Sequence, residues 1–97
     1  MPFNVDKPGK KIQEICNKLG EPYKVRVFDL RNVIYRDLGN GYDFEIAGLD
    51  NQEQSFNADF YIWETGSQPH IVEKIIGISS FEKLTEELDK ALEKYLD

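Results

Sequence analysis

Cysteine and histidine are almost missing from this chain of 97 residues, which contains one of each, Cys16 and His70. A single cysteine cannot form a disulfide within the chain, and such sparing use is typical of a reducing compartment. Zinc sites take several cysteine and histidine ligands, so the sequence predicts no metal and no cofactor. A Cys–His nucleophilic pair is not expected, because Cys16 falls on the apolar face of a predicted helix; we predict no catalytic residues.

Long apolar runs are missing as well, and no leader sequence is expected. The longest apolar stretch is a few residues long, so no segment is expected to cross a membrane. The first residues, Met1 to Asn4, have neither the basic stretch nor the apolar core of a signal peptide. We therefore predict a cytoplasmic protein that does not bind membranes.

Positively charged residues are fewer than negatively charged ones. Twelve lysine and arginine residues stand against eighteen aspartate and glutamate residues, which gives a net charge of −6. Proteins that bind nucleic acids by neutralising phosphates usually carry a basic patch, so no nucleic-acid partner attracted by charge is predicted. The acidic excess supports one alternative function, an acidic inhibitor, immunity protein or nucleic-acid mimic.

Motifs for phosphate or calcium binding are incomplete. The pair Gly9-Lys10 lacks the earlier glycine and the serine or threonine of a phosphate-binding loop. The acidic segment Leu49–Gln54 lacks the ligand spacing and the glycine of an EF-hand loop, and it is predicted to be a polar connection. Asp43 and Glu45 share one face of a predicted strand and are expected to be surface charges.

The first predicted helix is capped by Asp6 or an adjacent residue and has Pro8 in its first turn. Gly20 and Pro22 supply its end. Its apolar stripe, at the spacing of one helical face, consists of Ile12, Ile15, Cys16 and Leu19.

A second helix is predicted at the C-terminus, where Ser79 and Glu82 have the spacing of a capping box. Charged residues of both signs alternate along one side of this segment, as on a solvated helix face. The opposite side is an apolar stripe of Phe81, Leu84, Leu88, Ala91, Leu92 and Tyr95.

Between these helices the hydrophobic period changes to two, which predicts about five strands. Turns are expected around Leu30–Asn32, at Asn40-Gly41 and at Gly66–Pro69. An Asn-Gly pair is typical of a two-residue type I′ turn, which would place Arg36 opposite Glu45.

The predicted fold is therefore a single α+β domain of residues 1–97 with two layers. It has an N-terminal helix, an antiparallel meander sheet and a C-terminal helix packed on the sheet. Whether both helices cover the same face is left open.

A four-residue turn at Gly66–Pro69 would pair Thr65 with His70 and Trp63 with Val72. One sheet face would then carry a candidate interaction surface of Tyr61, Trp63, His70 and Val72, and the core face would carry Phe60, Ile62, Ile71 and Ile75. Tyrosine and tryptophan are frequent at the centres of protein interfaces. The alternative is a second, partly covered layer. A one-residue shift of the turn would move His70 to the other face.

The string GYDFEIAGLDN (residues 41–51), followed by a strand with Trp63 and a capped C-terminal helix, resembles short uncharacterised proteins of Gram-positive bacterial mobile elements, such as conjugative transposons. The resemblance covers about the second half of the chain. It implies a bacterial cytoplasmic accessory protein and assigns no role to any residue.

The function that the sequence favours is a small non-enzymatic module that uses this aromatic face to bind another protein or, as a homodimer, a second copy of itself. Besides the acidic inhibitor, the other alternative is an enzyme with an unrecognised site, in which His70 works with Glu64 or Glu73.

Overall fold

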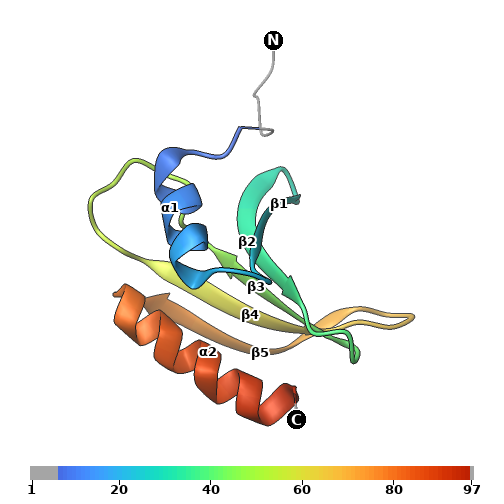
Figure 1. Ribbon diagram of the computed structural model, residues 1–97. Helices are drawn as coiled ribbons and strands as arrows, with labels where there is room; N and C mark the ends of the chain where they lie inside the picture. The colour runs from blue at the N-terminus through green and yellow to red at the C-terminus, as the bar shows by residue number, and fades with distance from the viewer. Residues whose placement is uncertain (1–6, 97) are drawn as a thin grey trace.

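The computed structural model describes residues 7–96, and its elements follow the predicted order. Five strands pair with their sequence neighbours, each pair antiparallel, so the sheet is a meander (Figure 1). The α+β fold is thus confirmed. No helix within this range is long and apolar enough to cross a membrane. The elements are α1 (Lys10–Leu19), β1 (Lys24–Phe28), β2 (Arg31–Asp37), β3 (Tyr42–Ala47), β4 (Ala58–Glu64), β5 (His70–Ile78) and α2 (Phe81–Tyr95).

Both helices pack on the same face of the sheet, which answers the question left open by the sequence. One core cluster joins Ile12 of α1 and Leu84 of α2 through the strand residues between them. Phe44 and Phe60 are its largest members, and their rings meet edge to face at 4.9 Å. α1 contacts β1 and β2, whereas α2 contacts β5 (Figure 1). The other side of the sheet carries neither helix, and we call it the outer face.

α1 begins later than predicted. Its first residue is Lys10 and its N-cap is Gly9, so Pro8 precedes the helix instead of lying in its first turn. No side chain caps the first turn of α1, but the N–H of Gly9 donates to the Asp50 carboxylate of a distant loop at 2.9 Å. Asp6, the predicted cap, lies outside the described residues. Gly20 ends the helix as predicted, with a positive φ of 77°.

α2 begins one residue later than the predicted capping box would place it. The N-cap is Ser80, whose Oγ accepts the N–H of Lys83 at 3.0 Å. The box of Ser79 with Glu82 is therefore wrong, since the residue at the required position after Ser80 is a lysine. The apolar stripe is confirmed: Leu84, Leu88 and Ala91 are buried, and Phe81, Leu92 and Tyr95 pack against the core.

The β1–β2 turn consists of Asp29 and Leu30, not of residues 30–32. Phe28 pairs with Arg31, so only two residues are left for the turn. Both have positive φ, 54° and 64°, as a type I′ turn requires. The turn was misplaced because Leu30, unlike Asp29, is not among the residue types that usually adopt this conformation.

The β2–β3 turn is one residue longer than the predicted Asn40-Gly41 pair. Leu38 donates its N–H to the carbonyl of Tyr42 at 3.0 Å, which leaves residues 39–41 as the loop. Both glycines in it have positive φ. Arg36 consequently pairs with Phe44, and the predicted Arg36–Glu45 pair is wrong.

Candidate functional site

The β4–β5 register next to the turn differs from the predicted one because Thr65 belongs to the loop, whereas the pairs from Ile62–Glu73 to Phe60–Ile75 keep the predicted register. The N–H of Thr65 donates to the carbonyl of Gly41 at 2.8 Å, which ties this loop to the β2–β3 turn. Glu64 is then the residue that pairs with His70, and the predicted Thr65–His70 pair is wrong.

A β-bulge divides the predicted surface further. The register shifts between Ile62 and Trp63, so Trp63 pairs with Ile71, and Val72 has no partner in the ladder. The predicted Trp63–Val72 pair is wrong, and Ile71 does not belong to the core, which instead contacts Ile75.

His70 is separated from Trp63 by the same shift. It shares the opposite side of the hairpin with Glu64, and the His70 Nε2 atom lies 3.1 Å from Oε1 of that carboxylate. Both side chains are exposed. The structure therefore leaves Tyr61 and Trp63 on the outer face and removes His70 from their cluster.

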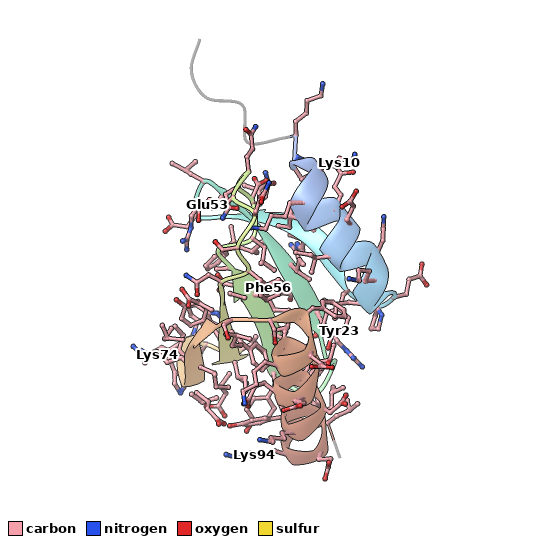
Figure 2. The ribbon with its side chains drawn as sticks, turned by 90° about the vertical axis from the view of Figure 1, so that its left-hand side faces the viewer. Lys10, Tyr23, Glu53, Phe56, Lys74 and Lys94 are labelled. Carbon is pink, nitrogen blue, oxygen red and sulfur yellow. The ribbon has the colours of Figure 1, made fainter. Side chains whose placement is uncertain are left out.

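Four residues of neighbouring strands form a row across the outer face. Tyr35 pairs with Glu45, Glu45 with Tyr61, and Tyr61 with Lys74. Lys74 projects to the side of the sheet away from the helices (Figure 2). These residues alternate along their strands with buried core residues, so the side chains of Tyr35, Glu45 and Tyr61 share this side.

A cavity of about 380 Å³ opens on the outer face, and Trp63 is one of its walls. Its two most buried members are Val33 and Glu45, which are 1% and 4% exposed. The residues that line it are Arg26, Val27, Phe28, Val33, Tyr35, Asp43, Glu45, Trp63, Thr65 and Pro69.

The rings of Phe28 and Trp63 meet across this cavity. Their centroids are 5.8 Å apart and their planes are inclined by 72°, an edge-to-face contact. Phe28 belongs to β1 and Trp63 to β4, with two strands between them. Such a contact requires a strongly curved sheet, and Figure 1 shows the β1–β2 hairpin turning away from the plane of β4 and β5. The outer face is therefore concave.

Glu45 is a buried carboxylate inside this concave face. Its Oε1 accepts the indole N–H of Trp63 at 2.8 Å. No lysine, arginine or histidine of residues 7–96 forms an ion pair with it. The sequence placed Glu45 among surface charges, and this expectation is wrong because the curvature brings Phe28 and Trp63 over it.

Tyr35 and Asp43 form a second polar pair at the cavity. The Tyr35 hydroxyl donates to Oδ2 of Asp43 at 2.7 Å, and the guanidinium of Arg26 lies 4.4 Å from the centre of the Tyr35 ring. Burial and the hydrogen bond to the carboxylate raise the pKa of Tyr35 to about 12. The pKa of Asp43 is raised as well, by burial and by the neighbouring Asp37 carboxylate, against the lowering effect of the Tyr35 hydrogen bond.

Away from the cavity, the acidic segment Leu49–Gln54 and the residues after it accept hydrogen bonds from Lys11 of α1. Lys11 Nζ donates to Asn51 Oδ1 at 2.7 Å and to the carbonyls of Glu53 and Ser55 at 2.9 Å each. Within residues 7–96 no three histidine, cysteine, aspartate or glutamate side chains form a group that could hold a metal.

Comparison with known proteins found no matching family model, no similar curated protein and no similar solved structure. The case for a function therefore depends on the geometry of the outer face.

Proposed function

We propose that this protein is a non-enzymatic binding module whose concave outer face holds a segment of a partner protein. The observation that carries the proposal is an exposed apolar rim beside a cavity with a buried carboxylate. Exposed apolar patches with polar neighbours typically mark interaction sites. Three large, exposed apolar side chains lie near Trp63: Phe28 contacts its ring, Ile71 pairs with it across the ladder, and Val72 follows Ile71. Leu30, in the turn that follows β1 and Phe28, is exposed as well.

The backbone conformation of Leu30 also supports the proposal. The Leu30 side chain is 66% exposed, and the φ of this residue, 64°, lies in the left-handed region that residues other than glycine and asparagine rarely adopt. An exposed leucine here gains little from folding, and it costs about 1–2 kcal/mol in conformational energy relative to glycine. A leucine that contacts a partner explains why such a residue stands at the tip of the turn.

The polar groups of the cavity are better suited to binding than to catalysis. A tyrosine with a pKa of about 12 stays protonated near neutral pH, so Tyr35 is a poor general base. Asp43 accepts the hydrogen bond of that tyrosine, and Glu45 accepts that of Trp63. We also propose a cytoplasmic location, in keeping with a single free cysteine that burial makes less reactive.

Selection from a random-peptide display library tests this proposal without a known partner. Peptides enriched on the wild type should lose binding to a Leu30→Ser/Ile71→Ser double variant. They should keep binding to Leu96→Ser, which removes an exposed leucine at the C-cap of α2, on the helix side of the sheet. Circular dichroism and urea unfolding establish that each variant is folded.

Peptides that bind wild type and the double variant equally would contradict the proposal. Sedimentation of the free protein tests the self-association alternative: a concentration-dependent dimer that the double variant abolishes would assign the face to a second copy instead.

A further inference from the structure

We infer that the group of the partner that enters the cavity is an arginine side chain. This inference depends on the proposed function and specifies the chemistry that the outer face recognises. It is argued from Glu45, from the charge of the cavity and from its aromatic walls.

Glu45 is the first argument. A carboxylate that is 4% exposed carries a large desolvation penalty unless it is paired and hydrogen-bonded. The only hydrogen bond to its side chain from residues 7–96 is the one from the Trp63 indole to Oε1. Its second oxygen therefore has acceptor capacity for a donor that arrives from outside, and a cationic donor forms the stronger bond.

The charge of the cavity is the second argument. Among its lining residues, Asp43 and Glu45 stand against the single guanidinium of Arg26. Arg26 is already engaged, since it lies over the ring of Tyr35 and forms no ion pair with either carboxylate. One further positive charge balances the site, which is the charge that an arginine side chain brings.

The walls are the third argument, and they favour arginine over lysine. The rings of Phe28, Tyr35 and Trp63 line the same cavity. A guanidinium is planar, more weakly hydrated than an ammonium and able to stack on aromatic faces while it donates to a carboxylate. Arg26 over Tyr35 shows this stacking within the chain itself. The volume of about 380 Å³ is near the lower end of ligand pockets, which suits one side chain.

The indole N–H of Trp63 gives a direct readout, because it is the only tryptophan and donates to Glu45. In a proton–nitrogen NMR titration, N-acetyl-arginine methylamide should shift this resonance saturably. The citrulline analogue has nearly the same shape without the charge, and it should bind about tenfold or more weakly, because a charged hydrogen bond is lost. The lysine analogue should bind more weakly than the arginine analogue.

Glu45→Gln is the decisive variant, since an amide oxygen can still accept the Trp63 N–H while the charge is removed. It should weaken binding of the arginine probe about tenfold, and the matched change Glu93→Gln on the exposed side of α2 should have no effect. The melting temperature of each variant separates loss of binding from loss of fold.

Equal binding of the arginine and citrulline probes, stronger binding of the lysine probe, or unchanged binding by Glu45→Gln would overturn the inference. If display-selected peptides bind the outer face but need no arginine, the inference fails and the proposed function stands. If no peptide depends on the outer face, the proposed function fails whatever the small probe does.

Discussion

At the residue scale, Tyr35 and Asp43 show how the concave face changes the chemistry of ordinary surface types. Their hydrogen bond lies beside the cavity, where burial disfavours both charged forms. Because the folded-state pKa of Tyr35 is about 12 and its ordinary value is 10.0, its contribution to stability is fully present below pH 10. That contribution is lost as the pH rises through about 12.

Asp43→Asn should lower the pKa of Tyr35 toward its ordinary value, because the carboxylate that opposes formation of the phenolate is removed. Alkaline titration followed by the ultraviolet absorbance of the phenolate measures this change, with Tyr35→Phe as the variant that identifies the Tyr35 signal. A Tyr35 pKa that stays at its wild-type value in Asp43→Asn would show that burial alone raises it.

Lys11 is the second residue whose role emerges only from the fold. Its ammonium donates three hydrogen bonds to the loop between β3 and β4. Lys11→Met should lower the free energy of unfolding by about 1–3 kcal/mol, because two carbonyls and an amide oxygen lose a charged donor. Urea unfolding measures the difference.

The neighbouring substitution Lys10→Met is the control, since Lys10 is exposed and its ion pair with Glu14 spans 4.0 Å on the helix surface. It should change stability by less than about 0.5 kcal/mol. Equal losses from the two substitutions would refute a specific role of Lys11.

The residues of the core could be predicted from spacing, whereas those of the cavity could not. Ile12, Leu84 and Phe60 are buried where the helical and strand periods place them. Glu45 obeys the same period and points away from the core, yet it is buried because Phe28 and Trp63 meet over the outer face. No local signal in the sequence encodes a contact between strands that are not neighbours.

At the scale of the element, two adjacent serines at the start of α2 have different roles. Ser80 accepts the N–H of Lys83, and Ser79 makes no such contact as the residue before the cap. Ser80→Ala should cost about 1 kcal/mol of unfolding free energy, and Ser79→Ala should cost only a few tenths. Denaturant midpoints of the two variants decide the matter, and a larger loss at Ser79 would restore the capping box that the sequence suggested.

In the β1–β2 turn, Leu30 is proposed to contact the partner although its backbone conformation lowers the stability of the free protein. Leu30→Gly should raise the free energy of unfolding by about 1 kcal/mol, because glycine adopts a φ of 64° without strain. Leu30→Ala is the matched control: it removes the exposed side chain but keeps the strain, and its stability should stay near that of wild type. A loss of stability in Leu30→Gly would show that the leucine has a structural role in the free protein.

The number, order and type of the elements could be predicted, but the bounds of each of the three predicted turns differ in the structure. The periods of two and 3.6 come from the side chains of each element and are visible in the sequence. Register depends on turn conformation. Leu30 is an unusual residue for a type I′ turn, and the N–H of Thr65 donates to Gly41 in the loop. A shift of one residue was enough to separate His70 from Trp63.

At the scale of the whole molecule, the sheet divides the protein into two sides of different character. Both helices and the main core lie on one side (Figure 1). The other side is concave, has a buried acidic group, and leaves large apolar side chains exposed at its rim. This asymmetry is the reason to assign binding to the outer face.

The central claim is that this rim is kept for a partner at the expense of stability. The affinity of a display-selected peptide for wild type and for Leu30→Gly tests it most directly. We predict that Leu30→Gly, although more stable, binds the peptide about tenfold more weakly, as expected when an apolar side chain at an interface is lost. Equal affinity of the two proteins for the peptide would contradict the account.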